Sequence, residues 1–245
     1  MKKQWKILPT LLCLLLLSAC GGEETGTWTP VEDFTFSLEA AAGVGPDTEL
    51  FDPGDFDPSV INDPDHTYNP KGWLDENTVL CTRYDSDSYT NKEMVAVTLD
   101  GQVSLLDVDI DTYTMVTAQN GVVVYAGYYE TILNEGVTFA RWDGDESLAP
   151  IHHFEEGTAI SFQQFFSPDG TKAVMSWIPE VPDTDWKVRI IDLETGDYQD
   201  VTPPEIESET PIILFSHWID DSTLLITASD MLPDGYTAAW EYTLP

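Results

Sequence analysis

Short runs of apolar and β-branched residues recur from about residue 70 to the end of the chain. Each run closes on Gly, Asn, Asp or Pro, and no window of the sequence keeps an apolar period of 3.6 residues. This pattern predicts an all-β fold, because β-branched side chains suit a pleated, half-buried surface. A content of 42% hydrophobic and 22% charged residues in 245 excludes a collagen, a coiled coil or a wholly disordered chain.

The runs group into a repeating unit. In each unit a strand leads through a polar turn into a second, strongly apolar strand, at 73–80, 117–124, 166–175 and 218–226. A third strand follows, and short fourth strands are expected at 103–107 and 198–202. Three of the third strands end at Gly101, Gly144 and Gly196, where a tight hairpin needs a positive φ. These glycines recur at intervals of roughly 40 to 50 residues, which is the spacing of four-stranded β-propeller blades.

One unit also resembles a known family. Phe166-Ser-Pro-Asp-Gly-Thr-Lys, followed by an apolar strand and by Ile190-Ile-Asp-Leu-Glu-Thr-Gly-Asp197, is similar to a TolB-type blade. Trp73-Leu-Asp-Glu-Asn and Trp218-Ile-Asp-Asp-Ser keep the strand and polar turn but lack the proline and glycine. The resemblance implies a small TolB-like β-propeller over about residues 69–245, with a β-sandwich as the alternative.

The number of blades follows from counting strands. The last unit has strands near 212–218, 223–228 and 237–244, and is one strand short. We expect Phe34-Thr-Phe-Ser-Leu38 to fill this gap and to close the ring, which removes an open sheet edge. The count predicts about four blades, or five if residues 39–68 form a degenerate blade.

The amino end has the pattern of an export signal. Basic residues precede an apolar run from Ile7 to Ala19, which is shorter than the roughly 20 residues of a membrane-spanning helix. Leu17-Ser-Ala-Cys-Gly21 resembles a bacterial lipobox. The resemblance implies a signal peptide over residues 1–19, cleavage before Cys20 and lipidation of its thiol. An ordinary secreted protein with a spare thiol is the alternative.

The lipobox resemblance implies a location in the cell envelope. A lipidated Cys20 would anchor the chain to the extracytoplasmic face of a bacterial membrane. Two acyl chains bind a membrane stably, whereas a single chain binds it only marginally. Residues 20–30 are then the lipidated cysteine with a flexible stalk, and residues 31–245 are the β-propeller-like domain. We expect the acidic body to stand away from anionic lipid.

Charge restricts the partners. The chain has 10 Lys and Arg against 44 Asp and Glu, a formal net charge of −34. Nucleic acid is excluded as a direct partner, because phosphate binding needs a basic surface. A basic protein or peptide is the electrostatic complement. Alternatively, the acidity itself keeps the surface hydrated and implies no specific partner.

Candidate metal ligands gather in the segment from Asp47 to Asp65, where oxygen ligands that suit calcium lie at short spacing: Asp52, Asp55, Asp57, Asn62, Asp63 and Asp65. The prolines in this segment make an extended acidic loop equally natural. Asp107-Val-Asp-Ile-Asp111 begins like an EF-hand loop, but Thr112 and Ala118 replace the required Gly and Glu. His152 and His153 should face opposite sides of a strand and cannot chelate together. We therefore assign no metal and no cofactor.

Catalytic motifs are missing from the sequence. It has no Gly-x-Ser-x-Gly elbow, no His-Glu-x-x-His and no phosphate-binding loop. Cys81 lies in a strand-like run and is expected to be a buried, unreactive thiol. Aromatic residues that could stack on sugars are more often core: Trp142, Trp177, Trp186, Trp218 and Trp240. The sequence therefore predicts a non-catalytic binding or scaffolding protein. A glycan hydrolase that uses paired carboxylates is the alternative, but 44 acids do not single out a pair.

Overall fold

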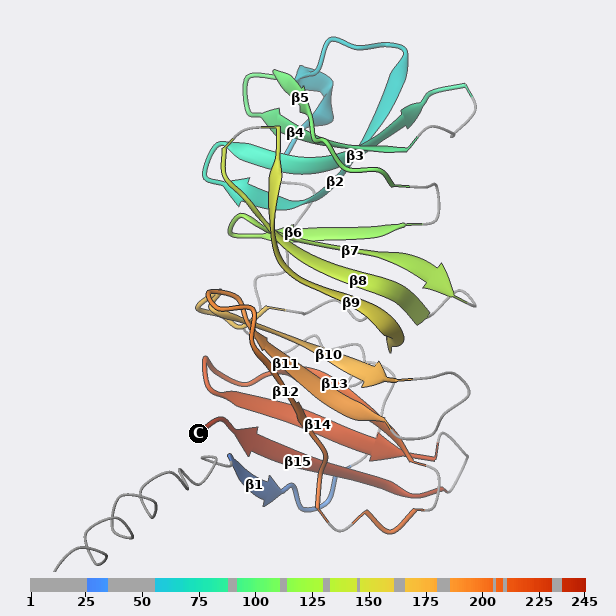
Figure 1. The fold of residues 1–245 in the computed structure, drawn as a ribbon, viewed down its shortest axis with the longest axis vertical. Coiled ribbons are helices and arrows are strands. Elements are labelled where there is room, and N and C mark those ends of the chain that lie inside the picture. The colour runs from blue at the N-terminus through green and yellow to red at the C-terminus, as the bar shows by residue number, and fades with distance from the viewer. Residues whose placement is uncertain are drawn as a thin grey trace, which may run out of the picture.

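The computed structural model describes residues 26–34, 56–87, 92–110, 114–129, 133–144, 146–160, 166–179, 186–204, 206–208, 211–230 and 235–245. These residues form fifteen β-strands, one short 3-10 helix and no α-helix, so the all-β prediction is confirmed. Groups of strands from successive parts of the chain lie one after another along the molecule, and the amino-terminal strand lies at the far end, beside the last strand (Figure 1). No helix in the described ranges has the length and apolar character needed to cross a bilayer.

The first meander is an antiparallel run of four consecutive strands. They are β2 (His66–Asp75), β3 (Thr78–Asp85), β4 (Glu93–Thr98) and β5 (Val103–Leu105). The two central strands carry the apolar core residues, whereas β5 is largely exposed. Gly101 closes the β4–β5 turn with φ +84°, as the Asp-Gly pattern predicts.

The second meander has the same form. Its strands are β6 (Met115–Gln119), β7 (Val122–Tyr129), β8 (Leu133–Trp142) and β9 (Leu148–Ile160). Asn120 and Gly121 both have positive φ, 49° and 77°, between β6 and β7. Two successive positive φ angles match the right-handed twist of a two-residue hairpin.

The third meander contains the Ser-Pro-Asp-Gly turn. Phe166 forms an isolated bridge with Ala173 of β10 (Lys172–Ile178), which pairs with β11 (Lys187–Asp192) and then β12 (Tyr198–Val201). The Gly170 backbone N–H donates to the Ser167 carbonyl at 2.8 Å. The Asp169 carboxylate accepts the Thr171 backbone N–H at 2.9 Å. The Ser-Pro-Asp-Gly segment is therefore a tight turn, as expected.

The fourth meander ends the chain and takes in the amino-terminal strand. Its order is β1-β15-β14-β13, with β13 (Ile212–Trp218), β14 (Thr223–Ser229), β15 (Thr237–Thr243) and β1 (Thr27–Pro30). An early strand thus fills the gap in the last unit. Thr27–Pro30 takes this place, however, and the expected segment does not: Phe34 follows the strand, and residues 35–38 lie outside the described ranges.

The position of β1 also corrects the expected stalk. Residues 27–30 pair with β15 in register from Thr27 opposite Thr243 to Pro30 opposite Trp240. The Trp28 ring packs on the Tyr242 ring with centroids 4.5 Å apart, so this segment gains an apolar anchor that a free linker lacks. The signal peptide over residues 1–19, Cys20 and residues 21–25 lie outside the described ranges.

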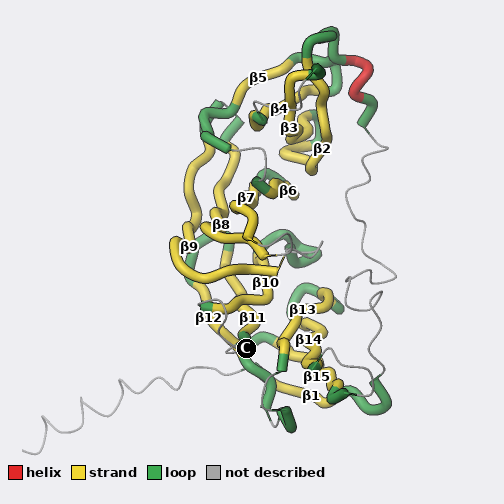
Figure 2. Tube along the Cα trace, turned by 90° about the vertical axis from the view of Figure 1, so that its right-hand side faces the viewer, coloured by secondary structure: helices red, strands yellow, loops and turns green. Residues whose placement is uncertain are grey.

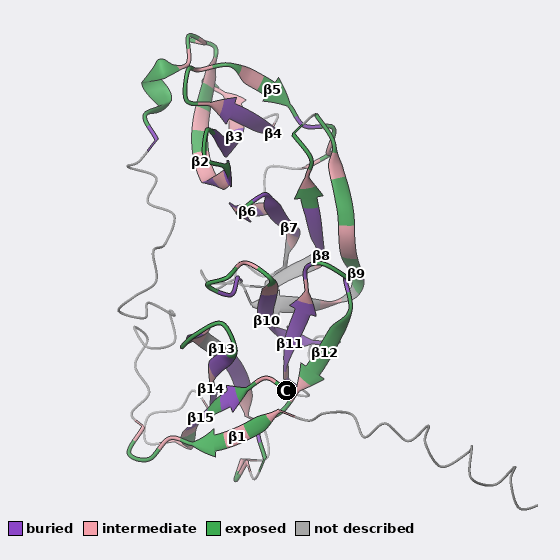
Figure 3. Ribbon diagram, turned by 90° about the vertical axis from the view of Figure 1, so that its left-hand side faces the viewer, coloured by how far each residue is buried: buried purple, intermediate pink, exposed green. Residues whose placement is uncertain are grey.

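Apolar cores lie between successive meanders. Leu80 of the first meander shares a core with Val123 of the second. Phe139 of the second shares one with Trp177 of the third, and Ile190 of the third with Ile226 of the fourth. The meanders therefore stack on one another along an arc (Figure 2). The outer strands β5, β12 and β1 are mostly exposed (Figure 3).

Backbone pairing joins the first three meanders into one eleven-stranded sheet, and the fourth is a separate sheet. The first and second meet at a parallel contact between Gly72 and Ala118, and β9 pairs with β10. The first and fourth meanders stand at the two ends of the arc (Figure 2). No described strand of one pairs with a strand of the other, so the expected ring closure is not confirmed.

The outer face of the first meander is covered by the segment that precedes it. Phe56 is buried against Val79 and Val95, and Ile61 packs beside them. The short helix η2 (Pro58–Val60) connects these two residues. Residues 56–65 therefore hold no strand of an additional blade, and residues 39–55 lie outside the described ranges.

Candidate functional site

The expected lipidation site and two candidate calcium ligands cannot be placed in the fold. Cys20, Asp52 and Asp55 lie outside the described ranges. Cys81, by contrast, lies on β3 with no exposed surface. Burial raises the pKa of its thiol to about 12. The prediction that this cysteine is buried is confirmed, and its low reactivity stays a prediction.

The described part of the acidic segment bonds to its own chain. The Asp57 carboxylate accepts the Ser59 backbone N–H at 2.9 Å and caps η2, and this bond lowers the Asp57 pKa. The Asp63 carboxylate accepts the Asp65 backbone N–H at 3.2 Å. Among the described residues, no three His, Cys, Asp or Glu side chains gather as a metal site. These acids are turn and cap residues in the described structure.

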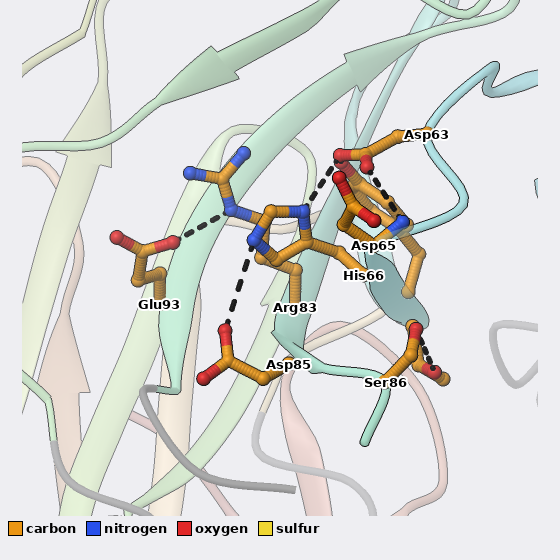
Figure 4. Close-up of polar contacts among 9 residues, drawn as sticks. Asp63, Asp65, His66, Arg83, Asp85, Ser86 and Glu93 are labelled. Carbon is orange, nitrogen blue, oxygen red and sulfur yellow. Dashed lines mark hydrogen bonds and ion pairs between the residues drawn. The ribbon is translucent and has the colours of Figure 1, made fainter. Parts of the chain in front are cut away.

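A polar network surrounds His66 at the start of β2 (Figure 4). Asp63 Oδ2 accepts the Tyr68 hydroxyl at 2.7 Å and lies 2.8 Å from His66 Nδ1. The Tyr68 hydrogen bond is the main cause that lowers the Asp63 pKa. His66 Nε2 lies 3.9 Å from Asp85 Oδ1, across the β2–β3 pair. The histidine thus stands between two carboxylates.

The chemistry of this network is that of an ion-pair cluster. An acid–base dyad needs a nucleophile or substrate next to the second ring nitrogen of the histidine. Here a carboxylate, Asp85, occupies that side. Next to it, Arg83 Nε donates to Glu93 Oε2 at 2.6 Å and ties β3 to β4. The network fixes the entry of the chain into the first meander.

The other candidate histidines and aromatic residues are in the sheets. His152 lies 4.1 Å from the Phe154 ring, whereas His153 Nδ1 lies 2.7 Å from the Thr138 hydroxyl. These neighbours on β9 thus contact different partners, as expected for alternate faces. The core prediction holds for four tryptophans, which are at most 9% exposed: Trp177, Trp186, Trp218 and Trp240. Trp142 is only half-buried and lines a cavity.

An arginine enclosed by aromatic rings was not predicted. The Arg189 guanidinium carbon lies 4.7, 4.3 and 4.4 Å from the ring centroids of Phe154, Trp177 and Tyr198. Two guanidinium nitrogens donate to the Asp200 carboxylate at 2.7 and 2.8 Å. The only sequence signal is one arginine within the apolar run of β11. Its ring partners come from three other strands, so spacing along the chain does not reveal them.

A cavity of about 740 Å³ lies between the first and second meanders. Its lining combines carboxylates, hydroxyl groups and one indole: Asp75, Thr78, Ala96, Thr98, Ser104, Asp107, Trp142, Gly144, Glu146 and Ser147. No Lys, Arg or His is among these lining residues. The volume is in the range of small-ligand and side-chain sites.

Both meanders supply walls of this cavity. Thr78 opposes Thr98, and Ala96 opposes Ser104, so these four residues form one face at the edge of the first meander. Opposite them stands the β8–β9 turn, from Trp142 to Ser147. Asp107, singled out as the start of an EF-hand-like motif, instead donates its backbone N–H to the Glu146 carbonyl at 2.8 Å. The backbone thus ties the two walls together.

Comparison with known proteins adds little. No family model matches the chain, and no curated protein matches it. Among solved structures, a puromycin-hydrolyzing peptidase of Mycobacterium tuberculosis is similar at a TM-score of 0.34 and 10% identity. The match covers 73% of this chain and 36% of the peptidase chain. The chain thus spans about a third of that peptidase, and a similarity this weak carries no argument about fold or function.

Proposed function

We propose that this protein is a lipid-anchored, extracytoplasmic binding or scaffolding module without catalytic activity, and that its partner is a basic protein or peptide. One observation carries the choice of partner: most positive charges of the folded body make contacts within the chain. Beyond Lys6 they all lie in the described ranges, at Lys71, Arg83, Lys92, Arg141, Lys172, Lys187 and Arg189.

The contacts of these residues support the proposal. Arg83 and Arg189 pair with Glu93 and Asp200. Lys92, Arg141 and Lys172 donate hydrogen bonds within the chain, for example from Arg141 to the Leu193 carbonyl at 2.9 Å. Lys187 also has an interaction within the chain. Few cations are left to neutralise the acidic surface, which attracts cationic partners and repels anionic ones.

The proposed architecture is a short, TolB-like β-propeller with an open ring. Four antiparallel meanders in chain order, stacked through shared apolar cores, support it. The completion of the last meander by an amino-terminal strand is a further support. A crystal structure with two sheets face to face in a single sandwich would contradict this architecture.

The anchor is tested by replacing the lipidated residue. Mass spectrometry of the Cys20→Ala chain should show loss of the acyl mass, and the chain should move from the membrane fraction to the medium. A Cys20→Ala chain that stays bound to the membrane contradicts the anchor.

Binding is tested with a basic peptide at increasing ionic strength, where affinity should fall as the charges are screened. Affinity that does not change with salt contradicts an electrostatic partner.

A glycan hydrolase is the second candidate, because Asp75, Asp107 and Glu146 lie around one cavity. Glycoside hydrolysis needs two carboxylates on either side of the scissile bond. Incubation with envelope glycans tests it: reducing ends that appear with the unaltered chain, and not with Glu146→Gln, would favour hydrolysis over binding alone.

A further inference from the structure

The cavity between the first and second meanders is rich in acceptors for a cation. Carboxylates come from both walls: Asp75 and Asp107 from the first meander, and Glu146 from the second. Asp75 already accepts the Asn77 backbone N–H at 2.8 Å. The carboxylates of Asp107 and Glu146 make no hydrogen bond to a described residue, and both residues are exposed. Two carboxylates are therefore available to a ligand.

The nearest arginine in the sequence is turned away from this cavity. Arg141 precedes Trp142 on β8, and neighbouring strand residues face opposite sides. Its guanidinium donates to the carbonyl of Leu193 in the third meander. No positive side chain of the lining neutralises the carboxylates. The negative potential is concentrated between two walls, where it acts more strongly than on a flat surface.

An indole adds a second interaction for a cation. Trp142 lines the cavity and is half-buried, because it also packs beside the core shared by the first and second meanders. Ammonium and guanidinium groups bind to the face of an indole, and adjacent carboxylates complete their charge and hydrogen bonds. A neutral ligand would use the indole and the hydroxyl groups but would gain nothing from three negative charges.

The walls are held in place before a ligand arrives. The Asp107 backbone N–H bonds to the Glu146 carbonyl at 2.8 Å, and the Trp142 backbone N–H bonds to the Gly121 carbonyl at 2.8 Å. Both bonds fix lining residues to the strand ends of the second meander. Groups that are already positioned lose less conformational freedom on binding, so more of each contact remains as affinity.

We infer that this cavity receives a lysine or arginine side chain of a basic peptide, with Trp142 against the cation and the carboxylates of Asp107 and Glu146 on either side. The inference rests on the proposed function, because it assigns the place where the basic partner is recognised. The volume of about 740 Å³ admits such a side chain with its neighbouring backbone, and is larger than a bare ion requires.

The test is titration of acetylated, amidated pentalysine into the full chain in neutral detergent, followed by calorimetry. The double variant Asp107→Asn/Glu146→Gln keeps the side-chain shapes and removes both charges. Its affinity should fall about tenfold, since each close charge pair contributes up to a few-fold. The matched control Glu194→Gln/Glu241→Gln removes two exposed charges outside the cavity and should change affinity by less than about twofold.

Two further measurements identify the ligand class. Pentalysine with acetylated side chains, which are neutral, should not bind. Trp142→Phe keeps a ring but has a weaker π-face and should lower affinity about threefold. Circular dichroism of each variant shows that its strands are intact.

The remaining outcomes separate the two proposals. An equal loss of pentalysine affinity in both double variants would overturn the cavity site but not the proposal that the partner is basic. No binding of pentalysine by the unaltered chain at low salt would overturn both. A neutral oligosaccharide that binds to the chain and is lost in Asp107→Asn/Glu146→Gln would overturn the cationic ligand.

Discussion

At the scale of single residues, Arg189 on β11 contacts three other strands. Its ring partners lie on β9, β10 and β12, and its carboxylate partner Asp200 is also on β12. The residue is only 8% exposed, so water does not compensate for lost contacts. A planar guanidinium can stack on rings and form two parallel hydrogen bonds at once, which an ammonium group cannot do. Arg189 is therefore a structural cation of the third meander.

Replacement of Arg189 should destabilise the protein in a graded way. Arg189→Ala should lower the free energy of unfolding by about 2 kcal/mol, because it leaves Asp200 without its partner and removes three ring contacts. Arg189→Lys keeps the positive charge and should lower the free energy of unfolding by less than Arg189→Ala does. Urea unfolding followed by tryptophan fluorescence measures both, and equal losses for the two variants would show that the retained positive charge contributes nothing to stability.

Cys81 provides a pH-dependent prediction. Only the thiolate reacts with alkylating agents, and the pKa of this thiol is raised to about 12. The native thiol is therefore neutral throughout the range from pH 7 to about pH 10, and its alkylation should stay slow across that range. Iodoacetamide labelling read at Cys81 by peptide mass spectrometry measures this. Urea should restore the ordinary rate, and fast labelling of the native chain would contradict the burial.

At the scale of elements, the junction between the first and second meanders depends on one glycine. A Cβ atom on Gly72 would lie 1.8 Å from the Ala118 carbonyl oxygen, at the parallel contact of β2 with β6. Gly144 also has a positive φ, +97°, but its Cβ would meet no atom within 4 Å. Alanine variants at these two positions therefore distinguish the effect of a steric contact from the effect of backbone strain.

The two alanine variants should therefore differ. Gly72→Ala should lower the free energy of unfolding by about 3 kcal/mol or more, because the strands must move apart. Gly144→Ala should cost about 1 kcal/mol, the price of a left-handed backbone for an L-residue. Thermal unfolding of both compares them. Similar thermal midpoints for the two variants would mean that β2 and β6 can move apart without loss of stability.

The amino-terminal strand gives a second prediction at this scale. Trp28→Ala removes the ring that packs on Tyr242, so β1 should detach from β15 more often. Hydrogen exchange should accelerate at β15 amides that face β1, while β3 amides in the first meander stay protected. Exchange that rises equally in both strands would indicate global destabilisation instead.

At the scale of the whole molecule, self-repulsion should limit stability. A formal net charge of −34 opposes a compact state, and added salt screens that repulsion. The thermal midpoint should rise by several degrees between low salt and about 1 M sodium chloride. Sodium chloride is preferred because sulfate strengthens apolar burial whatever the charge. A midpoint that does not change would show that the acidic side chains are too far apart to repel.

Much of the strand order could be predicted from local pattern. Alternation of Val188 and Ile190 around Arg189 predicts a strand, and the Asp-Gly and Thr-Gly pairs predict turns that the structure confirms at Gly101 and Gly196. The candidate site could not be predicted in this way. Asp107 and Trp142 line one cavity only because two meanders pack together, and no spacing along the chain reports that arrangement.

The sequence alone determined that the chain is all-β, that it is strongly acidic and where its hairpins turn, because these depend on side-chain composition and local backbone preference. Tertiary structure decided which early strand completes the last meander, the aromatic surroundings of Arg189 and the acidic cavity. Each of these brings together residues that are distant in the sequence, and their contact energy depends on how whole sheets stack.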